Sequence, residues 1–244
     1  LEGANGSSCD WVKLPKTEGE AGEISLPFLV YENNSEFSRD ATLTLSCGEK
    51  STVIAIHQNA NPDAVKYIDK ADIPDYDKYI CPGVWNEGFE KGPEHMLRDD
   101  AKWSWHRHAQ SEHFFVFWEP QFGPDPNSSD VPAALRVDIE DLLAKAEQFY
   151  QTNIETLKMV EVGQGKSYLD DYKMQIYILY QTEWLATGSG YDNTIGALWV
   201  NPSTCQPVGS TIAHEIGHSF QYQVSCDKIK QGLANELFDG NGWS

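Results

Sequence analysis

The chain has 244 residues, of which 40% are hydrophobic and 12% aromatic, enough apolar material for one large or two small packed domains and too much for a disordered chain. Its formal charge of −19 argues against nucleic acid or an anionic membrane surface as a partner. No apolar run approaches the roughly 18 residues of a transmembrane helix, so we predict no membrane-spanning segment.

The beginning of the chain and its cysteines bear on where the protein works. The first residues, from Leu1, show no signal-peptide pattern, and we interpret them as a processed or excised start. No Cys-x-x-Cys pair occurs, which argues against a cysteine zinc site, and an odd number of cysteines leaves at least one thiol without a partner in the chain. This cysteine usage is compatible with an exported protein. The five are Cys9, Cys47, Cys81, Cys205 and Cys226.

Residues 9–60 have the pattern of an all-β module. Short runs near residues 26–30, 41–46 and 52–57 alternate in side-chain type, as strands do. Between the last two runs, Cys47–Lys50 forms a short glycine-containing segment that predicts a hairpin loop. We therefore expect a small β-sandwich, and we place its junction with the rest of the chain between Asn59 and Asp63, where alternation gives way to Asn-Ala-Asn-Pro.

This module resembles the BACON domain, an immunoglobulin-like module attached to exported enzymes of gut-type bacteria. The resemblance is carried by Trp11, Asn34-Ser35, the strand from Arg39 to Leu45, and the strand from Val53 to Ala60. It implies an immunoglobulin-like sandwich over residues 1–60 and carbohydrate or mucin as a partner, with a spacer role as the alternative. The chain departs from the family in lacking the first strand before Trp11. We interpret Trp11 as a core residue rather than a sugar platform.

Residues 61–110 are rich in proline, acidic residues and aromatic residues. So many aromatic side chains predict a linker that packs onto one or both domains rather than a solvated tether. Four histidines lie in this segment or just after it and are candidates for an additional metal ligand, although we favour loop or surface positions for them. They are His95, His106, His108 and His113.

Residues 111–244 predict an α+β domain. An apolar run over 112–118 predicts a buried strand, and apolar residues at helical spacing predict a helix of about five turns that starts near Asp130 and Pro132 and reaches Tyr150. Strands are expected over 174–180 and 195–201, followed by a helix that Pro207 opens.

The strongest motif is His-Glu-x-x-His over residues 214–218, inside the expected last helix. His214 and His218 are four residues apart, so their imidazoles lie on one helix face and can reach a single ion. Glu215 stands between them, where a carboxylate can hold and deprotonate a zinc-bound water that attacks a polarised carbonyl. This pattern predicts peptide-bond hydrolysis.

The rest of that helix supports the same interpretation. An apolar stripe over Ala213, Ile216, Gly217, Phe220 and Val224 would pack against the domain and leave the two histidines beside it. A glycine costs about 1 kcal/mol in a helix interior, so Gly217 suggests close approach of another backbone.

The motif resembles that of the zincin metallopeptidases. The metzincin extension is absent, because Gln221 and Val224 stand where that pattern has glycine and histidine. The gluzincin pattern implies a third ligand on a following helix, and Glu236 lies at about the right distance, with an ordinary surface carboxylate as the alternative. The chain ends soon afterwards in a glycine-rich stretch, so we expect the domain to be incomplete at its C-terminus and the third ligand to lie there or beyond.

Two further roles follow from the zincin resemblance. The strand before the motif helix is the usual substrate-binding edge of that fold, which here predicts Gly196–Asn201 as the strand that pairs with an extended peptide. Tyr222, four residues past His218, is a candidate oxyanion donor, although helix packing is the favoured interpretation.

We therefore expect an exported protein, extracellular, at the cell surface or periplasmic, with an immunoglobulin-like sandwich followed by an α+β zincin-like domain. It would be a zinc peptidase with His214, His218 and, more weakly, Glu236 as ligands and Glu215 as general base and later proton donor, acting on a peptide, protein or glycoprotein. One alternative is a glycan- or surface-binding protein whose zinc site is vestigial or structural. Another is a zinc hydrolase that acts on a non-peptide amide or on glycan-linked peptides.

Overall fold

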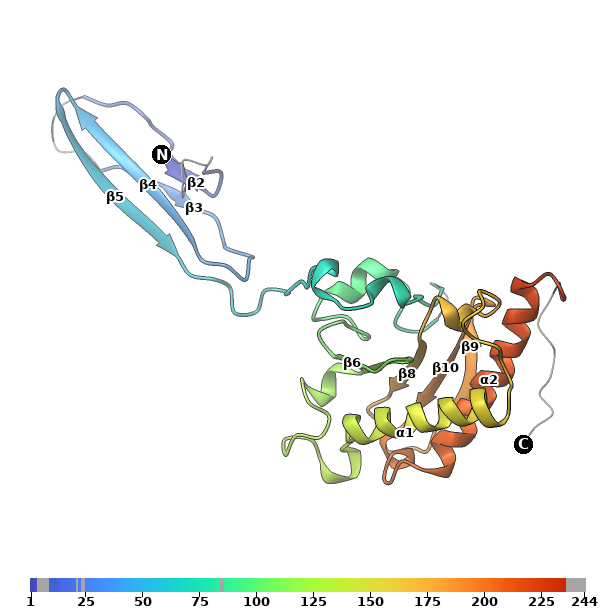
Figure 1. Ribbon diagram of the computed structural model, residues 1–244. Helices are drawn as coiled ribbons and strands as arrows, with labels where there is room; N and C mark the ends of the chain where they lie inside the picture. Colours follow the sequence, from blue (N-terminus) through green and yellow to red (C-terminus); the bar gives the residue numbers. More distant parts are fainter. Residues whose placement is uncertain (4–8, 21, 23–24, 84–85, 236–244) are drawn as a thin grey trace. The chain divides into compact units, whose positions relative to one another are not determined.

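The computed structural model describes residues 1–3, 9–20, 22, 25–83 and 86–235. The chain divides into two compact units, Leu1–Lys66 and Tyr67–Ser244 (Figure 1). The division falls a few residues beyond the junction expected between Asn59 and Asp63, and it assigns most of the expected linker to the second unit. Within the described residues, no helix combines the length and apolar character needed to cross a bilayer.

Unit 1 is a small β domain. Strands β4 (Arg39–Cys47) and β5 (Lys50–Gln58) form an antiparallel hairpin in which Cys47 pairs with Lys50, which confirms the predicted hairpin. Strand β1 (Glu2–Gly3) pairs with the other side of β4, so a short strand does precede Trp11, contrary to the expectation. A separate two-stranded sheet joins β2 (Val12–Lys13) to β3 (Leu29–Val30).

The core of unit 1 is small and centres on Trp11. This side chain is buried together with Val12 and Ala41. The Arg39 guanidinium lies 4.5 Å from the centre of the Trp11 ring, an arrangement that a cation and an aromatic face favour. Trp11 is therefore a core residue, as the sequence predicted.

Unit 2 is built on a mixed five-stranded sheet in the order β6-β7-β8-β10-β9. The three central strands are parallel and the two outer strands are antiparallel to their neighbours. Their bounds are β6 (His108–Gln110), β7 (Phe114–Trp118), β8 (Met174–Ile178), β9 (Ala186–Tyr191) and β10 (Ile195–Val200). The strands predicted near 112–118, 174–180 and 195–201 are confirmed, and β9 was not predicted.

Alternation along the strands gives this sheet two different faces. The helix face consists of Phe114, Val116, Met174, Ile176, Gly188, Gly190, Gly196 and Leu198. The aromatic face consists of Phe115, Phe117, Gln175, Tyr177, Tyr191 and Trp199. The assignment follows from contacts: the Phe114 ring meets Tyr150 of α1, Gly196 lies against Ser219 of α2, and Tyr177 stacks on Trp199.

Two helices cover the helix face. They are α1 (Ile139–Gln151), continued by a π-helical turn at Thr152–Thr156, and α2 (Ser210–Lys230). The helices cross (Figure 1), and the rings of Tyr150 and Phe220 meet there at 5.3 Å. Helix α1 begins later than predicted because the Asp138 side chain accepts a hydrogen bond from the Asp141 N–H and so caps it there.

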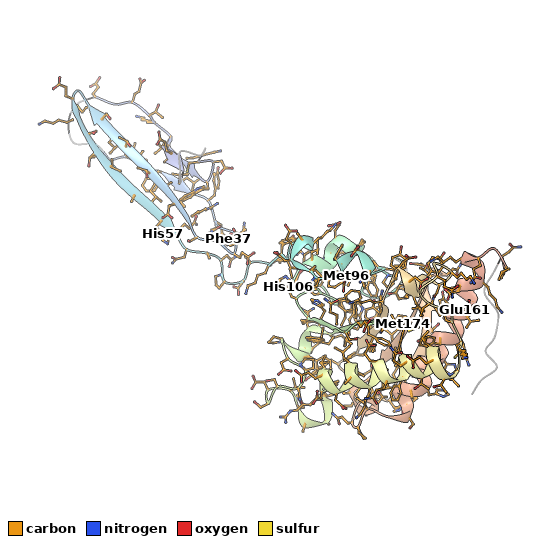
Figure 2. The ribbon with its side chains drawn as sticks, in the orientation of Figure 1. Phe37, His57, Met96, His106, Glu161 and Met174 are labelled. Carbon is orange, nitrogen blue, oxygen red and sulfur yellow. The ribbon has the colours of Figure 1, made fainter. Side chains whose placement is uncertain are left out.

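The aromatic face is covered by residues 67–110. Trp103 and Trp105 of this segment are buried against Phe117 and Tyr177, and the Tyr79 hydroxyl hydrogen-bonds the Tyr177 hydroxyl at 3.1 Å. Met96, labelled with Met174 of β8 in Figure 2, is buried as well. The segment is therefore a layer of unit 2. Trp85, also counted among its aromatic residues, lies outside the described residues.

Seven short helical turns join the strands and helices in the part of the chain that the structure describes. One of them, η9, follows β10 and leads toward α2, in agreement with the prediction that Pro202 ends this strand. They are η2 (Lys70–Asp72), η3 (Tyr76–Lys78), η4 (Pro93–Leu97), η5 (Pro120–Phe122), η6 (Ala133–Leu135), η8 (Tyr168–Asp170) and η9 (Pro202–Thr204).

Candidate metal centre

The motif helix α2 lies unusually close to strands β9 and β10, and glycines make this approach possible. A Cβ atom on Gly188 would lie 1.9 Å from the Glu215 carbonyl oxygen, and one on Gly196 would lie 2.7 Å from the Ser219 carbonyl oxygen. A Cβ on Gly190 would lie 2.3 Å from the Tyr222 ring. Any larger residue at these positions would push the helix away, so the glycines fix its distance from the sheet.

A stripe of polar side chains ties α2 to the same two strands. Glu215, Ser219 and Gln223 recur every four residues and therefore lie on one helix face. Glu215 Oε2 accepts a hydrogen bond from the Gly188 N–H at 2.5 Å, and Ser219 Oγ donates to the Ala197 carbonyl at 3.0 Å. Gln223 Oε1 accepts from the Gly196 N–H at 3.0 Å.

Burial on α2 differs from the predicted stripe. The buried apolar residues are Ile212, Ile216, Phe220 and Cys226, with the polar stripe beside them. No atom outside the neighbouring turns of the helix lies within 4 Å of an ideal Cβ on Gly217. The close approach predicted at Gly217 is therefore wrong, and the glycines that do permit close approach are on the sheet. The helix also starts at Ser210 rather than at Pro207.

The two motif histidines converge on one point. Their Nε2 atoms are 2.9 Å apart and their rings are perpendicular. Two nitrogens that bind one tetrahedral zinc ion at 2.0–2.1 Å stand about 3.3 Å apart, so the pair is within a few tenths of an ångström of that spacing. His214 is exposed and His218 is half-buried, which leaves the point between them open to a ligand.

Glu215 is held differently from the histidines. It is only 6% exposed, and its Oε2 is anchored on β9 by the Gly188 N–H. The helix therefore carries a carboxylate directly after His214 in the sequence, and the same carboxylate fastens α2 to the sheet. The sequence motif indicated the first property and gave no sign of the second.

A third ligand is not found in the described part of the chain. No group of three His, Cys, Asp or Glu side chains among the described residues is placed to hold a metal ion. Glu236, the predicted third ligand, lies outside the described residues. The donors that fit zinc here are thus the two imidazoles, which are ligands that zinc accepts.

The other candidate histidines take part in the packing of unit 2. His113 Nδ1 lies 2.7 Å from Glu147 Oε2, and its ring stacks on Tyr150 at 3.9 Å. His108 Nδ1 donates to the Trp105 carbonyl at 2.6 Å, and burial lowers the pKa of His108. His106 has its Nε2 buried without a partner among the described residues, and His95 lies in the short helix η4.

Two expected roles on this face change with the structure. Strand β10, predicted as the open edge at Gly196–Asn201, lies between β8 and β9, so that prediction is wrong and the edge strand is β9. Tyr222 packs on Gly190, and its hydroxyl accepts a hydrogen bond from the Asn193 N–H at 3.2 Å. Burial raises the pKa of Tyr222 to about 12. Tyr222 thus packs between α2 and the β9–β10 turn.

The fold and the site define a class of protein: a small β domain followed by an α+β domain whose motif helix lies on the edge of a mixed sheet. Residues 3–59 match BACON, described as "Putative binding domain, N-terminal", which confirms the resemblance of unit 1. Residues 77–244 match DUF6055, described as a family of unknown function. Because this match spans more than half of the chain, the protein belongs to the DUF6055 family. No curated protein and no solved structure matches the chain.

Proposed function

We propose that unit 2 is a zinc-dependent peptidase domain with a zincin-like arrangement, carried by an exported protein whose N-terminal unit is immunoglobulin-like. The observation that supports this most directly is the convergence of His214 Nε2 and His218 Nε2 at 2.9 Å. A bound Zn²⁺ would supply Lewis acidity toward a carbonyl oxygen and toward water. A third ligand, Glu236 or a residue beyond the described part, would complete the set.

Glu215 is the proton carrier in this proposal. Its Oε2 accepts from the Gly188 N–H, and among the described residues no hydrogen bond occupies Oε1. Oε1 would take a proton from the attacking water and later return it to the leaving amine. The Gly188 bond keeps the carboxylate from rotating away, so the base is positioned before substrate arrives.

The open edge of β9 supplies a place for an extended peptide. Residues of an antiparallel strand alternate between bonding the partner strand and pointing their N–H and C=O groups away from it. The Leu185 carbonyl accepts from the Asn201 N–H of the β10 side, which places Ala186, Gly188 and Gly190 in the outward set. The Gly188 N–H is already bonded to Glu215, so Ala186 and Gly190 are left to bond a peptide. We therefore assign peptide binding by strand addition to β9, next to Glu215.

One substitution at Glu215 and one at His214 test this function in the full chain. Glu215→Gln keeps an oxygen that can accept from the Gly188 N–H but removes the base, so zinc content should hold while turnover of a peptide and glycopeptide library falls roughly 10²- to 10⁴-fold. His214→Ala should lose the metal. Elemental analysis that finds undiminished zinc in a His214→Ala, His218→Ala double variant would rule the site out.

A second candidate function is favoured by the anchoring of Glu215 on β9. The hydrogen bond that fastens α2 to the sheet is a sufficient structural reason for a glutamate at position 215, without any catalytic role. Unit 1, in addition, matches BACON, described as "Putative binding domain, N-terminal". In this case the protein would bind glycan or mucin through unit 1. Wild type and Glu215→Gln would then be equally inactive on every peptide, while both would bind glycan.

A further inference from the structure

We propose that Gln221 is the positioning residue that fixes His218 as a metal ligand, a role that rests on the proposed zinc site. His218 has two ring nitrogens with separate contacts. Nδ1 lies 2.9 Å from Gln221 Oε1, and Nε2 lies 2.9 Å from His214 Nε2. Gln221 thus holds the nitrogen of His218 that points away from the candidate metal position.

The chemistry of the Gln221 contact decides where the proton of His218 lies. An amide oxygen only accepts hydrogen bonds, so Nδ1 must carry the hydrogen of the neutral imidazole. The lone pair is then on Nε2, the atom that faces His214. Metal-binding histidines are typically held in this way, because a bond from the outer N–H fixes both the tautomer and the ring orientation.

The position of Gln221 is fixed by its neighbours on α2. Residues 218 and 221 are three apart and lie on adjacent turns of one face. Ser219 and Gln223, on either side of Gln221, are both hydrogen-bonded to the sheet, so this turn of the helix cannot shift independently. The amide therefore reaches His218 from an anchored backbone.

His214 is held less firmly than His218. In the described part of the chain, its hydrogen bond is the one to His218 Nε2, and no acceptor meets its Nδ1. His218 is therefore the ligand oriented before a metal arrives. Loss of the outer partner of a ligating histidine typically weakens metal binding by roughly 10- to 100-fold.

Zinc affinity of the full chain, measured by competition with a chromophoric chelator, tests this role. Gln221→Leu keeps the side-chain size but removes the acceptor and should weaken binding by roughly 10- to 100-fold. Gln221→Glu keeps an acceptor and should bind at least as tightly as wild type. Gln231→Leu, at the C-terminal end of the same helix, is the matched control and should leave the affinity unchanged. Circular dichroism would verify that each variant is folded.

The tautomer of His218 gives a readout that needs no metal. In the zinc-free protein, long-range ¹H–¹⁵N correlations recorded at about pH 8 should show the proton of His218 on Nδ1, and Gln221→Leu should lose this preference. A proton on Nε2 in wild type would mean that the amide nitrogen faces His218 and would overturn the proposal. Equal zinc affinity in wild type and Gln221→Leu would overturn it while leaving the proposed function intact. A wild-type protein that binds no zinc would overturn both.

Discussion

The two faces of the unit 2 sheet are filled in opposite ways. The aromatic face is packed by large rings, with Trp103 and Trp105 buried against Phe117 and Tyr177. The helix face beneath α2 has glycines at three positions, and short polar contacts from Glu215, Ser219 and Gln223. The aromatic face is held by side-chain volume, and the part of the helix face under α2 is held by close approach of backbones.

This difference explains where the candidate site lies. Large side chains between a helix and a sheet keep the helix too far from the strands for one of its carboxylates to bond the strand backbone. Where the strand residues are glycines, Glu215 reaches the Gly188 N–H directly. The glycine-rich part of the helix face is thus the place where helix residues and a strand edge can act together.

The largest expected effect concerns the tyrosines of the aromatic face. Burial raises the pKa values of Tyr79, Tyr177 and Tyr191, so the folded chain keeps three protons that the unfolded chain releases above about pH 10. Stability should be unaffected by them below that pH and should fall as the pH rises above it, by about 1.4 kcal/mol per pH unit for each tyrosine. Urea unfolding between about pH 9 and 11 measures this slope.

Tyr177→Phe sharpens that test. It keeps the ring on the aromatic face and removes one hydroxyl group, so the alkaline slope should become shallower by about 1.4 kcal/mol per pH unit. An unchanged slope would show that Tyr177 does not keep its proton in the folded state.

The next largest effect is a difference in unfolding free energy between substitutions of two tryptophans. Trp103 is 1% exposed and Trp184 is 67% exposed. Trp103→Ala should cost roughly 3–5 kcal/mol of unfolding free energy, because it opens a cavity in the aromatic face, whereas Trp184→Ala should change it by less than about 0.5 kcal/mol. Denaturant unfolding measures both. Similar costs would mean that residues 67–110 do not form a core layer.

The smallest effect is a difference in stability between substitutions of two glycines, one on β9 and one on α2. Gly188→Ala places a methyl group 1.9 Å from the Glu215 carbonyl oxygen and should cost roughly 1–3 kcal/mol or more. Gly217→Ala meets open space in a helix interior and should stabilise the protein by up to about 1 kcal/mol. If Gly188→Ala unfolds at the wild-type urea concentration, the helix is not held close by this glycine.

Elements made of apolar runs could be predicted from the sequence, and β9 could not. Strands β7, β8 and β10 are apolar and buried on both faces, so their residues identify them without reference to the rest of the fold. Strand β9 reads Ala-Thr-Gly-Ser-Gly-Tyr, a composition typical of a loop. Its glycines are required because α2 lies close to the strand, and this packing cannot be inferred from the local sequence. The zincin resemblance predicts β10 as the edge, and in the structure β9 takes that place.

The candidate site likewise has a part that the sequence predicts and a part that depends on tertiary packing. His214, Glu215 and His218 could be identified because their relation depends only on helix geometry. Helix geometry could also have indicated the contact between Gln221 and His218, because residues three or four positions apart lie side by side on a helix. In the sequence, Gln221 stands out only as a departure from the metzincin pattern. The bond between Glu215 and Gly188 joins residues 27 positions apart and could not be inferred locally.

The aromatic layer also has a consequence for synthesis of the chain. Residues 67–110 leave the ribosome before the strands that bury them. At roughly 5–20 residues per second, the stretch from Trp105 to the end of β10 at Val200 takes on the order of 5–20 s to emerge. During that time the tryptophans and tyrosines of this layer have no complete sheet to pack against, so the nascent chain exposes an aromatic-rich segment that chaperones which bind aromatic residues can recognise.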